Sequence, residues 1–266
     1  ADKNFWAPEM HLYRGGYYLF ASFKADGVCR GTQILRADHP LGPFEEWSDG
    51  PVTPRDWECL DGTLYVDGDG KPYMVFCHEW VQIKDGTIAY LPLTDDLRAA
   101  AGPAVELFAA SSAPWNNHDD PNGTHVTDGP FLYRTSGGKL LMLWSTFGKH
   151  GYAIGYYVSQ SGGIEGPWVP AEQPLFDRDG GHGMLFTDKS GQLMLTIHSP
   201  NDTPNERAIF LPVIDTGDGL TPRAWRAFPG IRRFLFYEKA FCSFAESLSA
   251  VPDGLRLGSR SHAAAL

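Results

Sequence analysis

The sequence predicts an all-β protein of the β-propeller type. Four segments of similar pattern recur along the 266 residues, and each contains two apolar, strand-like runs joined by a turn that contains glycine. None of these segments has the period of a helix. Long repeats that consist only of strands are typical of propeller blades. The turn glycines are Gly16, Gly70, Gly138 and Gly191.

Four hairpins are expected in order along the chain. They lie at 7–23, 59–78, 126–145 and 180–199. Turns such as DGDGK and SGGK suit hairpins, because glycine adopts a positive φ without strain. A further strand-like run follows each hairpin, at 32–47, 86–97, 152–168 and 206–216. Each unit should therefore form a blade of three or four antiparallel strands. A β-sandwich of short strands is the alternative, but it does not predict self-similar units.

These units place the propeller at residues 1–222. Residues 223–266 match no repeat, and part of this segment could form a strand pair or a helix. The formal net charge of −10 argues against nucleic acid or an anionic membrane as a partner. The absence of any run of 18 apolar residues in the sequence argues against a helical membrane span.

Polar residues recur at one point of each expected first strand. In a propeller the first strand of every blade lines the central channel, so residues at equal positions converge on one cavity. Aligning the repeats on their strand-ending aromatic residues superposes, within one residue, Glu9, Asp61, Asp128 and His182. A turn cap would explain one such acid, but it explains a recurring set less well.

Carboxylates around a cavity suit glycoside hydrolysis. One carboxyl protonates the leaving oxygen, and a second, about 6.5–9.5 Å away in inverting enzymes, activates water. A third can hold the pKa of the acid high. Aromatic side chains near the ring could stack on sugar faces, and the candidates are Trp6, Trp80 and Trp144. Trp115, in a polar loop, is a candidate for the rim of the cavity.

Four motifs resemble glycoside hydrolase family 43, whose members are five-bladed propellers that act on arabinose- and xylose-containing glycans. The motifs are FWAPEMH, LDGTLYVDGDGKPY, VTDGPFLY and GGHGMLF, and the resemblance spans about residues 5 to 220. The resemblance implies that Asp61 modulates the pKa of the acid and that Asp128 stands at the acid's position. It also implies that His182 lies on the axis near a bound calcium or sodium ion or a water. No cofactor is required.

The sequence departs from the family pattern at two points. The family's acid is usually glutamate, and Asp128 is shorter by one C–C bond, roughly 1.5 Å. Glu79, between His78 and Trp80, is therefore a second candidate for the acid. The family's general base lies on a blade that precedes the WAPE segment, whereas only five residues precede Trp6 here. We therefore expect an N-terminally truncated sequence in which about four blades are recognisable and the base lies upstream of residue 1.

These observations favour an inverting glycosidase that resembles α-L-arabinofuranosidases or β-xylosidases, with a carbohydrate as its substrate. The expected catalytic residues are Asp61, Asp128 and Glu79, and the residues expected to bind substrate are Trp6, Glu9, His78, Trp80 and Trp144. A non-catalytic carbohydrate-binding propeller that has lost its base is the alternative. A propeller scaffold for protein partners is disfavoured, because a scaffold needs no axial carboxylates.

Overall fold

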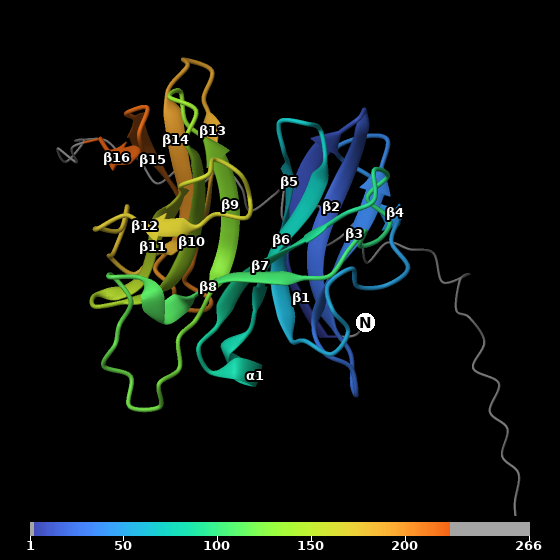
Figure 1. Ribbon diagram of the computed structural model, residues 1–266, viewed down its shortest axis with the longest axis horizontal. Coiled ribbons are helices and arrows are strands. Elements are labelled where there is room, and N and C mark those ends of the chain that lie inside the picture. The colour runs from blue at the N-terminus through green and yellow to red at the C-terminus, as the bar shows by residue number, and fades with distance from the viewer. Residues whose placement is uncertain (1–2, 224–266) are drawn as a thin grey trace, which may run out of the picture. The chain divides into compact units, whose positions relative to one another are not determined.

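The computed structural model describes residues 3–223, and these form four antiparallel sheets of four strands each. Figure 1 shows the sheets following one another in chain order, from blue to orange. In every sheet, strands that are consecutive in sequence are neighbours. The expected all-β propeller, with four recognisable blades, is confirmed for this part of the chain.

The strands of the four blades have the following bounds. Blade I contains β1 (Lys3–Tyr13), β2 (Gly16–Lys24), β3 (Gly31–Ala37) and β4 (Glu45–Glu46). Blade II contains β5 (Cys59–Val66), β6 (Pro72–His78), β7 (Thr87–Pro92) and β8 (Val105–Ala109). Blade III contains β9 (Asp128–Arg134), β10 (Leu140–Gly148), β11 (Gly151–Ser159) and β12 (Trp168–Pro170). Blade IV contains β13 (Gly181–Thr187), β14 (Leu193–Ser199), β15 (Arg207–Asp215) and β16 (Leu220–Pro222).

Two short helical turns lie between the strands. The helix α1 (Trp80–Ile83) connects β6 to β7, and the 3-10 turn η1 (Ala110–Ser112) follows β8. Among residues 3–223, no helix is long and apolar enough to cross a membrane.

The hairpin turns lie where the glycine pattern indicates. Gly70, Gly138 and Gly191 have φ of 81°, 84° and 84°, a region that only glycine occupies without strain. In the first hairpin the positive φ falls on Gly15 instead, and Gly16 already begins β2. The expected turn is therefore present there, one residue earlier.

Three apolar cores join successive blades. Blades I and II share a core that includes the fully buried Phe20 and Phe76. Blades II and III share a second core around Trp144, and blades III and IV share a third around Leu143 and Leu195. Full burial of such a side chain stabilises a fold by about 1.5–3 kcal/mol. The face-to-face packing of blades therefore sets how their first strands meet.

Residues 3–223 belong to one compact unit by their contacts. The expectation of a strand pair or a helix within 223–266 concerns residues that, apart from Arg223, lie outside the described part of the chain.

Candidate active site

Each first strand has a β-bulge at the same height. At this point two residues of the first strand lie opposite one residue of the second, and the pairs are Ala7–Pro8, Asp61–Gly62, Gly129–Pro130 and His182–Gly183. The first residue of every pair has a positive φ, at 44°, 56°, 53° and 50°. A bulge redirects a side chain and bends its strand. The four bulges therefore define equivalent positions around the axis.

The positions of the four bulges correct the alignment of the repeats that was made from the sequence. Asp61 and His182 occupy the bulge itself, whereas Asp128 comes one residue before the bulge of its blade. Glu9 comes after the bulge of β1 and corresponds to Thr63, from which its Oε1 accepts a hydrogen bond of 3.0 Å. Glu9 is thus bonded to blade II beside the ring, and Ala7 holds the ring position of blade I.

In blades II, III and IV the backbone of the ring residue is held by the preceding blade. The amide of Asp61 donates to Ser22 Oγ at 2.9 Å, and the amide of His182 donates to Ser145 Oγ at 2.8 Å. In blade II the equivalent residue on the second strand is Cys77. The amide of Gly129 donates instead to the Asp61 carboxylate at 2.9 Å. Asp61 therefore links blades II and III directly.

Side chains from three blades meet at this point. Asp61 Oδ2 lies 3.6 Å from His182 Nδ1, so the carboxylate of blade II faces the imidazole of blade IV. His182 packs over Gly129, where an added Cβ would lie 2.7 Å from the imidazole Cδ2. The structure thus brings Asp61, His182 and the start of β9 together, as the repeat pattern predicts.

Asp128 lies in this cluster with its carboxylate hydrogen-bonded to a buried tyrosine. Its Oδ2 accepts a hydrogen bond of 2.7 Å from the Tyr152 hydroxyl. Burial, together with the nearby charge of Asp61, raises the pKa of Asp128 to about 7. Burial also raises the pKa of Asp61, against the opposing effects of His182 and the Gly129 amide. A carboxyl with a pKa near neutrality can donate a proton at physiological pH.

Glu79 is buried immediately before α1. Its carboxylate forms an ion pair with Arg30, whose guanidinium lies 4.4 Å from the centre of the Trp6 ring. Burial raises the pKa of Glu79 above its ordinary value, although the charge of Arg30 opposes this shift. Sequence reasoning missed Arg30, which lies just before β3, and Tyr152, which lies on β11, because neither belongs to a motif.

Two of the residues expected to bind substrate are not placed to do so. Trp144 is 0% exposed and packs in the core between blades II and III, where Trp115 also lies. His78 is buried, stacks on Trp57 with ring centres 4.2 Å apart, and hydrogen-bonds to Glu106 and Gln82. The expectations for Trp144, His78 and the rim residue Trp115 are therefore wrong.

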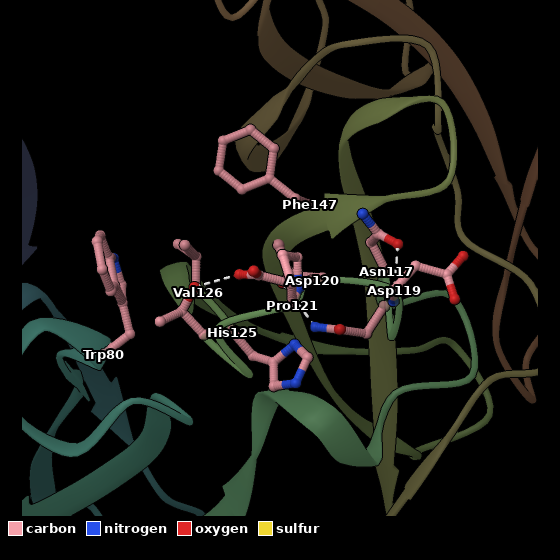
Figure 2. Close-up of a pocket in the computed structure, with 11 residues that line it drawn as sticks. Trp80, Asn117, Asp119, Asp120, Pro121, His125, Val126 and Phe147 are labelled. Atoms are coloured by element: carbon pink, nitrogen blue, oxygen red, sulfur yellow. Dashed lines mark hydrogen bonds between the residues drawn. The ribbon is translucent and has the colours of Figure 1, made fainter.

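A hollow of about 450 Å³ opens beside the cluster. Trp80 stands on one side of it, the loop with Asn117 and Asp119 on the other, and Phe147 at a third side (Figure 2). Val126 and Thr146 also line the hollow. Val126 lies two residues before Asp128 in the sequence, and Thr146 follows Ser145, which pairs with Asp128 across the sheet of blade III. Both residues are therefore close to Asp128.

The expected cation near His182 is not supported by a set of ligands. Residues 3–223 contain no group of three or more His, Cys, Asp or Glu side chains that could hold a metal ion. Apart from Asp61, His182 has no carboxylate partner in an ion pair within the described chain. The described residues therefore do not form a chelating site by themselves.

A propeller with buried axial carboxylates is the architecture of a class of glycoside hydrolases. The sequence model of the family described as "Glycosyl hydrolases family 43" matches residues 1–220. The chain therefore belongs to glycosyl hydrolases family 43, as its four motifs indicate.

Similar proteins include a probable arabinosidase and an arabinofuranosidase. A probable arabinan endo-1,5-alpha-L-arabinosidase A of Aspergillus clavatus is 26% identical over 77% of this chain and 60% of its own length. An extracellular exo-alpha-(1->5)-L-arabinofuranosidase of Cellvibrio japonicus is 25% identical over 71% of this chain and 56% of its own length. The chain thus spans roughly three fifths of these relatives.

Solved structures share the fold. The endo-arabinase from Bacteroides thetaiotaomicron VPI-5482 is 45% identical, with a TM-score of 0.76 and coverage of 80% of this chain and 76% of that one. A thermostable family-43 glycoside hydrolase is 22% identical, with a TM-score of 0.74 and coverage of 85% and 77%.

Proposed function

We propose that this chain contributes the acid side of a glycosidase site that cleaves arabinose- or xylose-containing glycans with inversion of configuration. The observation that supports this most is the pKa of Asp128, raised to about 7 by burial and by Asp61. Similarity to arabinosidases and to an endo-arabinase favours arabinan among these substrates.

Asp128 is the proposed general acid. Its proton passes to the glycosidic oxygen as the C–O bond breaks, while water attacks the sugar from the opposite face and gives its proton to a base. Tyr152 fixes one carboxylate oxygen of Asp128 and leaves the other for the substrate. We propose no general base among residues 3–223.

Asp61 is the proposed modulator of the acid. Its charge raises the pKa of Asp128, and its own carboxylate is oriented by the Gly129 amide and by His182. Glu79 also has a raised pKa, because burial outweighs the charge of Arg30, but its carboxylate is engaged in the ion pair with Arg30 and is therefore less available to a substrate.

The acid assignment is tested with leaving groups of different quality. Asp128→Ala should lose most of its rate on arabino-oligosaccharides but keep it on 2,4-dinitrophenyl arabinofuranoside, because a good leaving group needs little protonation. Glu79→Ala should not show this selectivity. Reversed selectivity would transfer the acid role to Glu79.

The same assays separate the enzyme from its alternative. Binding of arabino-oligosaccharides with no hydrolysis of either substrate, measured on the natural full-length protein, would indicate a non-catalytic carbohydrate-binding propeller. Hydrolysis that is unchanged in Asp61→Asn would remove Asp61 from the site.

A further inference from the structure

Blades I to III each carry one fully buried residue on the second strand, opposite the residue that precedes the bulge. These residues are Ser22, Cys77 and Ser145. In blades I and III the serine hydroxyl accepts a hydrogen bond from the amide of the next blade's ring residue, at 2.9 Å and 2.8 Å. The ring position that follows Cys77 is that of Gly129, the bulge residue of blade III. Blade II therefore has a thiol where its neighbours have a hydroxyl.

The amide of Gly129 donates its hydrogen bond to a carboxylate instead of to the second strand of blade II. Its acceptor is Asp61 Oδ2, at 2.9 Å. Cys77 belongs to the core between blades II and III, so its side chain lies on the face of the sheet that meets blade III. A thiol sulfur is a weak acceptor, whereas an ionised carboxylate accepts strongly. The thiol therefore leaves this amide to Asp61.

The hydrogen bond from Gly129 favours the ionised form of Asp61. Burial raises the pKa of Asp61, and the charge of Glu9 adds to this effect. The charges of His182 and Arg30 and the amide of Gly129 act in the opposite direction. Among these opposing groups, the amide is a backbone donor that a better acceptor on β6 would remove from Asp61.

The ionised form of Asp61 matters for the proposed acid. Burial, and after it the charge of Asp61, raises the pKa of Asp128 to about 7. Burial and the charges of the same two carboxylates also raise the pKa of the Cys77 thiol well above its ordinary value. The thiol is therefore neutral at physiological pH and adds no third negative charge to the cluster.

We infer that Cys77 is a positioning residue: its thiol does not compete for the Gly129 amide, so this amide keeps the Asp61 carboxylate ionised and oriented beside Asp128. A hydroxyl at the same place, as in blades I and III, would take the amide for itself. The inference rests on the proposed function for the roles of Asp61 and Asp128. The hydrogen bond itself can be measured without a substrate.

Cys77→Ser replaces the weak acceptor by the one that blades I and III use. In nuclear magnetic resonance, isotope-labelled glycine and aspartate select the amides of Asp–Gly pairs, and the signal that Asp128→Asn removes is that of Gly129. In the wild-type chain this amide proton should resonate downfield, because it donates to a charged group. In Cys77→Ser it should move upfield, and the titration midpoint of the labelled Asp61 carboxyl should rise by about one pH unit, as expected when a hydrogen bond to a charged group is lost.

Cys77→Ala and Cys59→Ser are the matched controls. Cys77→Ala removes the thiol without adding an acceptor, so the Gly129 signal should keep its wild-type position even though the cavity lowers the Tm. Cys59 is equally buried but packs in the core between blades I and II, on the other face of the sheet. Cys59→Ser should therefore leave the Gly129 signal unchanged. A residue with only a packing role would respond to alanine and not to serine.

Ser145→Cys makes the opposite exchange in blade III, and it tests the reasoning even if Cys77→Ser does not fold. The amide of His182 donates to the Ser145 hydroxyl, so its proton should move upfield when a thiol replaces that hydroxyl. A His182 signal that keeps its position would show that a thiol accepts as well as a hydroxyl here, which overturns the inference.

Hydrolysis by the natural full-length protein separates this inference from the proposed function. There Cys77→Ser should slow cleavage of arabino-oligosaccharides more than cleavage of 2,4-dinitrophenyl arabinofuranoside, because it weakens proton donation. A Gly129 signal that is unchanged in Cys77→Ser, or displaced equally in Cys77→Ala, overturns the role of Cys77 and leaves the proposed function standing. If the signal moves as expected but no arabinoside is hydrolysed, Cys77 does position Asp61 and the proposed function fails.

Discussion

Replacing Asp128 by asparagine should stabilise the folded protein, and the gain should grow with pH. The pKa of Asp128 is raised to about 7 by burial and by the charge of Asp61. In an unfolded chain the same carboxyl has a pKa of about 3.9. The folded protein therefore binds this proton more tightly, and stability falls as pH rises through the interval between these two values.

The magnitude follows from the size of this shift. At about 1.4 kcal/mol per unit, ionising Asp128 in the folded protein costs about 4 kcal/mol above pH 7 and less than about 1 kcal/mol near pH 4. Asparagine has no charge to bury and can still accept the hydrogen bond from Tyr152. At roughly 2 °C per kcal/mol for a domain of this size, Asp128→Asn should melt about 8 °C higher at pH 8.

Thermal unfolding of both proteins at pH 4.5, 6 and 8 measures this difference. The Tm difference should be small at pH 4.5 and should reach its full value at pH 8. An equal difference at the three pH values, or an asparagine variant that is less stable at pH 8, would show that the pKa of Asp128 is not raised beside Asp61.

Three further outcomes are expected. Burial raises the pKa of Asp215, but hydrogen bonds from Gly217, Ser136 and Tyr133 outweigh burial, so the pKa is lowered overall. Asp215→Asn should therefore lower the Tm at pH 7, and this loss should disappear as the pH falls below 4, in the same melting assay. Arg30→Ala should cost about 3–5 kcal/mol in urea unfolding, because it leaves Glu79 buried without its ion pair. Trp144→Ala should cost about 3–5 kcal/mol of stability through a core cavity, and an unchanged urea midpoint would contradict its burial.

The blades could be predicted because their signals are local. Alternating apolar residues and a turn glycine such as Gly138 lie within a single hairpin, and the pattern recurs four times. The convergence of Asp61 and His182 followed from the symmetry of such repeats. Their facing side chains in the structure bear out this reasoning.

The remaining features of the site depend on contacts between distant residues. The alignment placed Glu9 beside Asp61 because nothing in the sequence marks where a bulge inserts its extra residue. The bulge residue Ala7 lies six residues before the aligned Tyr13, whereas Asp61 lies four residues before Tyr65. Trp144 resembled a sugar-stacking residue, but its strand is covered on that face by blade II. The partner of Glu79 is 49 residues away in Arg30, beyond the reach of any local pattern.

The serine hydroxyls on second strands have a consequence for engineering. Ser22 and Ser145 hold the amides of Asp61 and His182, so each axial residue takes its position from the sheet before it. Small changes in how two neighbouring sheets are spaced will therefore move reactive groups that no substitution has touched. Libraries intended to tune turnover should include these second-strand positions, which a search confined to sugar-contacting side chains would leave unsampled.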